Sequence, residues 1–144
     1  MAISNSSEEY LDSVAIIGIA VRMPKALTVP QFWENLINGK ESISVFNQEE
    51  LIKSGISPEA IAHPNFIAAK GVMEEAEMFD AAFFGISPRE AELMDPQHRV
   101  LMECAWDAME NAGYVSDECS GRVSIFTSAG MNTYLPFNLM SNPD

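Results

Sequence analysis

The chain has 144 residues, 47% of them hydrophobic and 20% charged, which is the composition of one globular domain and excludes a disordered chain. Eight basic against 21 acidic residues give a formal net charge of -13, which argues against nucleic acid and anionic membrane surfaces as partners. No apolar run approaches the roughly 18 residues that span a bilayer, and the polar, acidic start is not a signal peptide, so the sequence predicts a cytoplasmic protein.

The predicted domain covers residues 13–144 and follows a mobile leader, residues 1–12, which is rich in Ser and Glu. The domain opens with "SVAIIGIAVRM", which is continuously apolar and β-branched and stops at Pro24. This pattern predicts an α/β fold in which the segment is a strand buried on both faces of a largely parallel sheet.

A helix is expected next, in "TVPQFWENLINGK". Thr28 fits the N-cap, Pro30 falls in the first turn and Gly39 follows the end. The apolar residues have the spacing of a helix packed on a sheet, and they are Phe32, Trp33, Leu36 and Ile37. The stretch that follows is less regular, and only a short helix around Gln48 to Ser54 is expected before a long surface excursion.

Two successive helices are predicted by "SPREAELMDPQHRVLMECAWDAMENAGY". Ser87 and Glu90 form an S-x-x-E capping box, so a short helix should run from about Pro88 to Met94. It ends there because the residue before a proline disfavours helical geometry. Asp95 and Pro96 then repeat the start signal with an acidic cap and a proline at the first helical position.

The second of these helices should run to about Ala112 and end at Gly113. One face has apolar residues at helical spacing and is predicted to be buried, so Ala105→Asp is expected to destabilise the protein strongly. The small residues on this face would allow a close approach to a neighbouring element. The face consists of Val100, Leu101, Cys104, Ala105, Ala108, Met109 and Ala112.

A second buried strand is predicted from Arg122 to Ser128, within "GRVSIFTSAG", and it runs into a glycine turn. The residues after it, "MNTYLPFNLMSNPD", are loop-like with an apolar middle. The sequence contains no internal repeat and no low-complexity tract.

The two cysteines, Cys104 and Cys119, are too few for a disulfide framework or a zinc site, and both are predicted to be free thiols. Cys104 lies on the apolar helix face, where a thiol behaves as a small hydrophobe. Cys119 lies among acidic residues that raise the pKa of a thiol. Neither is therefore predicted to be a nucleophile.

The two histidines, His63 and His98, have no acids at a ligand-like spacing, so no metal site is predicted. His98 fits a solvent-facing or capping role in the first turn of its helix. An acidic cluster before "FDAAFFG" is either a paired-carboxylate acid/base site or, as the more common case, a solvated face. The cluster consists of Glu74, Glu75, Glu77 and Asp80. With no phosphate-binding glycine motif and no nucleophile elbow, the residues alone assemble no active site.

Four segments in register, however, resemble the N-terminal part of the β-ketoacyl synthase (ketosynthase) domain of modular polyketide synthases. They are "VAIIGIAVRMP", "FWENLINGKESIS", "FDAAFFGISPREAELMDPQHRVLMECAWDAMENAGY" and "GMNTYLPFNL", and together they extend from Val14 to Leu139. The resemblance implies a thiolase-like α/β fold, of which this chain would be an incomplete N-terminal portion. It also implies a homodimer in the complete protein.

The family's reaction is a decarboxylative Claisen condensation between an acyl chain on a cysteine and a malonyl-type extender. The extender is carried by the phosphopantetheine of an acyl carrier protein, which is the implied partner together with the remainder of the ketosynthase domain. No cofactor is expected on this segment itself. The family's Thr-Ala-Cys-Ser-Ser elbow and its histidine motifs do not occur, so no catalytic role carries over to any residue and the segment alone is expected to be inactive. The family's Cys-Arg-Phe-Pro-Gly is replaced by "VRMPKA".

The resemblance makes Met131, Tyr134 and Phe137 candidate acyl-pocket residues near a dimer interface, and plain packing of a loop is the alternative. Two other functions stay open. The chain could be a free-standing, non-catalytic dimerisation or docking module derived from a ketosynthase. A small nucleotide-binding protein would need a phosphate loop that the sequence lacks.

Overall fold

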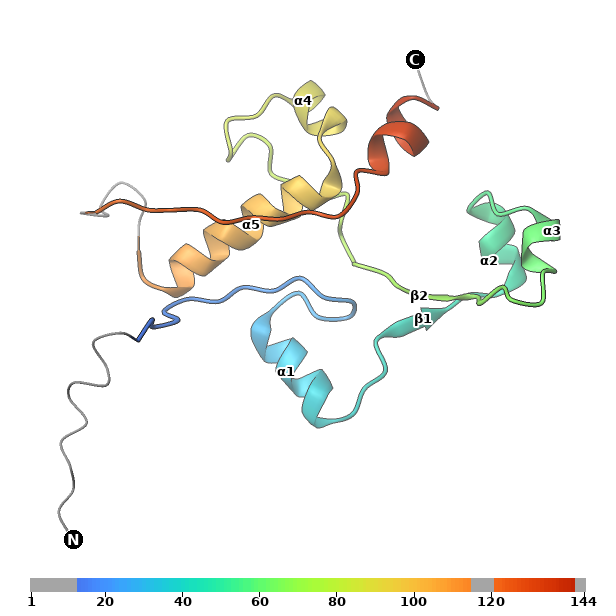
Figure 1. Ribbon diagram of the computed structural model, residues 1–144, viewed down its shortest axis with the longest axis horizontal. Coiled ribbons are helices and arrows are strands. Elements are labelled where there is room, and N and C mark those ends of the chain that lie inside the picture. Colours follow the sequence, from blue (N-terminus) through green and yellow to red (C-terminus); the bar gives the residue numbers. More distant parts are fainter. Residues whose placement is uncertain (1–12, 115–120, 142–144) are drawn as a thin grey trace, which may run out of the picture.

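The computed structural model describes residues 13–114 and 121–141 (Figure 1). The predicted leader, residues 1–12, and Cys119 lie outside them. The described elements are α1 (Val29–Ile37), β1 (Ile43–Val45), α2 (Gln48–Lys53), α3 (Pro58–Ile61), β2 (Ala69–Gly71), α4 (Pro88–Leu93), α5 (Pro96–Asn111) and η2 (Leu135–Leu139). Within these residues, no helix is both long enough and apolar enough to span a membrane.

The helix α1 confirms the prediction made from its caps. The Thr28 hydroxyl accepts a hydrogen bond from the Gln31 amide at 3.4 Å, and Pro30 lies in the first turn. Gly39, just past the end, takes a positive φ of 59°. The expected packing on a sheet is not found among the described residues, because the side chains of Trp33 and Ile37 are 62% and 66% exposed.

The described sheet is a short antiparallel pair in which β1 and β2 place Ile43 opposite Gly71 and Val45 opposite Ala69. The expected helix near Gln48 is α2, whose capping box joins Asn47 and Glu50. The predicted surface excursion after it also contains α3 and β2. Both are too short to have a recognisable period in the sequence.

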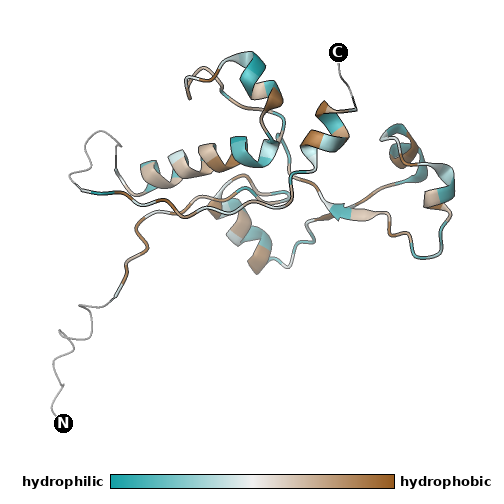
Figure 2. Cartoon of the chain, turned by 45° about the horizontal axis from the view of Figure 1, so that its top comes forward, coloured by the Kyte–Doolittle hydropathy of each residue, from teal (hydrophilic) through white to brown (hydrophobic). Residues whose placement is uncertain are grey.

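The two predicted strands, residues 14–21 and 122–128, are extended but have no ladder partner in the described part of the chain. Their apolar side chains are exposed, with Val14 at 93% and Phe126 at 94%. Figure 2 shows the brown of hydrophobic residues along the first of these segments. The prediction of paired, buried strands is therefore wrong for these residues. A segment that is apolar on both faces forms a sheet only where neighbouring strands supply its hydrogen bonds, and the described residues supply none.

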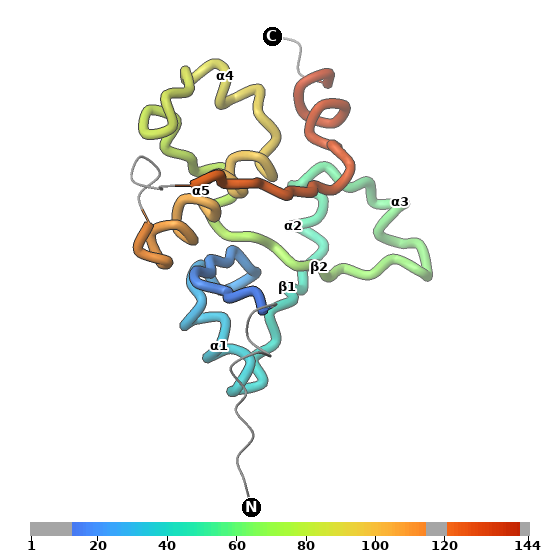
Figure 3. Tube along the Cα trace, turned by 60° about the vertical axis from the view of Figure 1, so that its left-hand side comes forward, coloured from blue at the N-terminus to red at the C-terminus, as the bar shows by residue number. Residues whose placement is uncertain are grey.

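The two extended segments both run beside α5, which is the longest element (Figures 1 and 3). The amide of Ile19 donates to the Asn111 side chain at 3.0 Å, which ties the first segment to the last turn of α5. The amide of Gly130, just after the second segment, donates to the Gln97 side chain at 2.9 Å, which ties the end of that segment to the first turn of α5. Side-chain hydrogen bonds thus hold both segments in place.

The double start of α4 and α5 is confirmed. Ser87 and Glu90 exchange both hydrogen bonds of a capping box, and the Asp95 carboxylate accepts from the Gln97 amide at 2.8 Å. The helix α5 ends before Gly113, whose φ is 74°. The local capping chemistry therefore determines where these helices begin and end.

The apolar face of α5 is only partly covered. Cys104, Ala108 and Ala112 are half-buried, whereas Ala105 and Leu101 are exposed. The expectation that Ala105→Asp would bury an unpaired charge is therefore wrong for this structure. Among residues 13–114 and 121–141, the buried residues are Ala26, Leu51, Ala91, Asp95 and Arg99.

Candidate functional site

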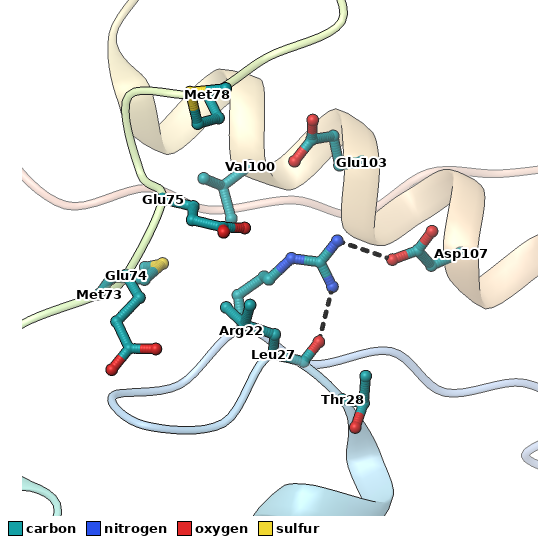
Figure 4. A pocket seen from close by; sticks show the side chains of 10 residues that line it. All are labelled: Arg22, Leu27, Thr28, Met73, Glu74, Glu75, Met78, Val100, Glu103 and Asp107. Atoms are coloured by element: carbon teal, nitrogen blue, oxygen red, sulfur yellow. Dashed lines mark hydrogen bonds and ion pairs between the residues drawn. The ribbon is translucent and has the colours of Figure 1, made fainter.

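Arg22, which follows the first extended segment, lies beside α5. A tight turn in which Met23 and Ala26 exchange two backbone hydrogen bonds of 2.9 Å directs the chain back at this point. The Arg22 guanidinium forms an ion pair with the Asp107 carboxylate at 3.0 Å and donates to the Leu27 carbonyl at 2.9 Å (Figure 4). This arginine therefore links the turn, the start of α1 and the middle of α5.

A cavity of about 330 Å³ surrounds this arginine. Glu103 and Asp107 reach it from α5, and Glu74 and Glu75 reach it from the loop after β2 (Figure 4). The predicted acidic cluster is therefore divided. Glu74 and Glu75 line the cavity, whereas the Asp80 carboxylate accepts a hydrogen bond from the Phe83 amide at 3.0 Å. The cavity is open and lined by side chains of both polar and apolar character.

Cys104 lies on α5, where the charges of Arg22, Asp107 and Glu103 act on its thiol. Burial raises the pKa of its thiol, the Arg22 guanidinium lowers it, and the Asp107 and Glu103 carboxylates raise it further. The net effect is a raised pKa, so the thiol stays protonated at neutral pH and is a poor nucleophile. This agrees with its interpretation as a structural residue.

The histidines are not brought together. His63 is exposed, and its Nδ1 accepts a hydrogen bond from the Asn65 amide at 3.2 Å. His98 is also exposed, in the first turn of α5. Among the described residues, no group of three or more His, Cys, Asp and Glu side chains could hold a metal ion.

The three candidate pocket residues all lie on the segment from Gly130 to η2. The Tyr134 hydroxyl donates to the Glu92 carbonyl at 2.8 Å, which attaches this segment to the end of α4. Met131 and Phe137 are 86% and 74% exposed, and none of the three lines the cavity around Arg22. Their role as pocket residues therefore stays a prediction.

The sequence did not indicate the role of Gln97 and Asn111, whose side chains hold the extended segments. Both are polar residues near the ends of a helix, where each could equally face solvent, and their partners Gly130 and Ile19 are distant in the sequence. The one local signal is the position of Gln97 two residues after the capping Asp95, within reach of its carboxylate.

A cluster of aromatic rings joins the loop after β2 to α5. The Phe83 ring meets the Trp106 ring edge-on, with centroids 4.8 Å apart, and Phe84 stacks on Phe79 at 5.2 Å. Such pairs are worth about 0.5–1.5 kcal/mol beyond the area that they bury. The "FDAAFFG" segment is therefore an anchor between the loop after β2 and α5.

The sequence matches the family described as "Beta-ketoacyl synthase, N-terminal domain" over residues 11–144. It is 45% identical over 123 residues to polyketide synthase PksN of Bacillus subtilis (strain 168), covering 85% of this chain and 2% of that protein. It is 38% identical over 132 residues to the pikromycin polyketide synthase component PikAII of Streptomyces venezuelae, covering 85% of this chain and 3% of that protein. The chain thus spans a small part of the length of these relatives.

Solved structures of similar proteins agree with this match. The ketosynthase from module 1 of the bacillaene synthase of Bacillus amyloliquefaciens FZB42 is 50% identical and superposes with a TM-score of 0.63, over 74% of this chain and 18% of that chain. Ketosynthase twelve from the bacillaene polyketide synthase of Bacillus amyloliquefaciens is 43% identical, with a TM-score of 0.66, over 72% of this chain and 18% of that chain.

Proposed function

Because the chain belongs to the β-ketoacyl synthase family and forms the N-terminal part of a thiolase-like ketosynthase domain, we propose that it serves as scaffold in the condensation reaction of a polyketide synthase. In that reaction a cysteine thioester holds the growing acyl chain. A malonyl-type extender loses carbon dioxide, and the resulting carbanion attacks the thioester carbonyl. The new carbon-carbon bond forms as the carbon-sulfur bond breaks and the cysteine leaves as its thiolate. The proposal assigns residues 13–144 to this domain.

The observation that carries the proposal is the pair of apolar extended segments beside α5. Both expose their side chains, as Ile16 at 89% and Ile125 at 81% do. Leaving such segments uncovered is costly, since a buried large aliphatic side chain contributes about 1.5–3 kcal/mol. Strands from the rest of a ketosynthase domain would cover them, which favours a part of a larger domain over a free-standing docking module.

In this proposal the catalytic groups are residues other than Cys104, His63 and His98. The Cys104 thiol has a raised pKa, and His63 and His98 are both exposed. The substrates are proposed to arrive on the phosphopantetheine of an acyl carrier protein. Met131, Tyr134 and Phe137 are proposed to line the acyl pocket near the interface of a homodimer.

Intact-protein mass spectrometry tests this proposal. The 144-residue chain and a ketosynthase domain that contains it are each incubated with an acyl thioester and then with a malonyl-loaded acyl carrier protein. The domain should gain one acyl group and then release a condensed product, whereas the chain alone should gain none. Acylation of Cys104 in the chain alone, located by peptide mapping, would contradict the scaffold role.

A further inference from the structure

The break between α4 and α5 removes the helical donor of the Glu92 carbonyl. In a continuous helix the carbonyl of Glu92 would accept from the amide four residues later, but that residue is Pro96, which has no N–H. The Tyr134 hydroxyl donates to this carbonyl at 2.8 Å. A side chain from the C-terminal segment therefore supplies the hydrogen bond that the proline removes.

A second contact lies one turn further along. The Asp95 carboxylate, on a residue that is only 6% exposed, accepts from the backbone amide of Gln97 at 2.8 Å and from its side-chain nitrogen at 3.4 Å. With its nitrogen held by the carboxylate, the Gln97 amide presents its oxygen to the backbone N–H of Gly130, at 2.9 Å. The helix cap thus orients the side chain that holds the distant glycine.

The glycine matters because the approach is close. A β-carbon at residue 130 would lie 3.1 Å from the Gln97 side-chain oxygen, which is tighter than ordinary packing. The segment of residues 130–139, which we call the clamped segment, is therefore attached at Gly130 and again at Tyr134. Between and beyond these points, Met131 and Phe137 are left free and exposed. Figure 3 shows the second extended segment crossing α5 before the chain reaches η2.

We propose that Gln97 and Tyr134 are positioning residues that hold the clamped segment at the α4–α5 junction and so determine which acyl chains Met131 and Phe137 accept. This inference rests on the proposed function, since it takes the clamped segment as part of the acyl pocket. Neither residue touches the reacting atoms. Both act through the backbone that carries the two apolar side chains.

Amide hydrogen exchange tests the clamp without any activity. Gln97→Met should increase the rate of amide hydrogen exchange at Gly130 about fivefold, which corresponds to the loss of one ordinary hydrogen bond. The matched control is Gln31→Met, because the Gln31 side-chain oxygen also accepts a backbone N–H, that of Leu27, at 2.9 Å. That variant should leave exchange at Gly130 unchanged. Equal exchange at Gly130 in wild type and Gln97→Met would overturn the clamp.

Acyl selectivity tests its consequence in a ketosynthase domain that contains the chain. Acyl thioesters of increasing length are compared by kcat/KM for self-acylation in wild type, Gln97→Met, Tyr134→Phe and the control Tyr114→Phe. The two clamp variants should change the ratio between long and short chains at least about threefold, and in Gln97→Met this change should come through KM. Tyr114→Phe should keep the wild-type ratio.

The two ideas fail in different ways. A uniform loss of rate for every acyl chain, or an unchanged ratio, would overturn the positioning role and leave the proposed function standing. A wild-type domain that accepts no acyl group at all would overturn the proposed function and the selectivity with it, and exchange at Gly130 would still decide whether the clamp exists.

Discussion

Gly18 lies so close to the last turns of α5 that a β-carbon on it would overlap the carbonyl oxygen of Ala108. The same β-carbon would lie 2.8 Å from that of Ala112. The neighbouring amide of Ile19 donates to the Asn111 side chain. The small residues of α5 thus allow the close approach that their spacing predicts, and the partner is the first extended segment.

Gly18→Ala should therefore destabilise the protein. Inserting a methyl group where the neighbour is backbone forces a shift, which costs about 1–3 kcal/mol of the free energy of unfolding. Urea denaturation measures the change. The matched control is Gly121→Ala, because a β-carbon there would meet nothing within 4 Å. Equal destabilisation by both substitutions would show that the contact with α5 does not matter.

The ion pair between Arg22 and Asp107 should have a small coupling energy. Their side chains are 24% and 40% exposed, and pairs near the surface contribute about 0.2–1 kcal/mol. A double-mutant cycle with Arg22→Met and Asp107→Asn, followed by denaturation at low and high salt, should give a coupling in this range that falls as salt rises. A coupling that is independent of salt would contradict a solvent-screened pair.

The capping box of α4 should make stability depend on pH. The hydrogen bond from the Ser87 side chain, and then that from its backbone, hold the pKa of Glu90 below its ordinary value. The contribution is therefore full above the ordinary glutamate pKa and is lost as the pH falls through the lowered value in the folded state. An NMR titration of the Glu90 carboxyl should find its midpoint below that of the unfolded chain.

Ser87→Ala should reduce this effect, because it removes the side-chain hydrogen bond and keeps the backbone one. It should return the pKa of Glu90 towards its ordinary value and cost about 1 kcal/mol, as the loss of an N-cap does. The pKa of Glu59 is an internal control, because its lowering comes first from its backbone hydrogen bond and then from Ser57. A Glu90 midpoint that does not move in Ser87→Ala would contradict the assignment.

The Cys104 thiol should react slowly with iodoacetamide at neutral pH. Burial is the main cause of its raised pKa, the Arg22 guanidinium lowers that pKa, and the Asp107 and Glu103 carboxylates raise it. Arg22→Met should raise the midpoint of the pH–rate profile, and Asp107→Asn should lower it. Peptide mapping assigns the adduct to Cys104. If both variants lowered the midpoint, loss of packing rather than charge would explain the result.

The helix boundaries could be predicted from the sequence because capping is local chemistry. Ser87 and Glu90 are three residues apart, and Pro96 determines the start of α5 by its own geometry. The sheet could not be predicted in the same way. Residues 14–21 have the pattern of a buried strand, but pairing requires a neighbour that no local pattern supplies.

The contacts that hold the clamped segment could not be predicted either. Gln97 and Gly130, like Glu92 and Tyr134, are joined by single hydrogen bonds between distant residues. Helical periodicity likewise places Ala105 on the apolar face of α5, although this residue is exposed in the described chain. A helical period gives the direction of a side chain and not the presence of a neighbour.

Gln97 and Asn111 hold the two extended segments, and their separation along α5 fixes how these segments are placed relative to each other. The two residues are 14 residues apart (111 minus 97), which is close to four helical turns and about 21 Å, so both point to nearly the same side of the helix. One residue inserted between them would swing Asn111 by about 100°, and a whole added turn would keep its direction but shift it by about 5.4 Å. The length of α5 therefore sets the stagger between the two extended segments.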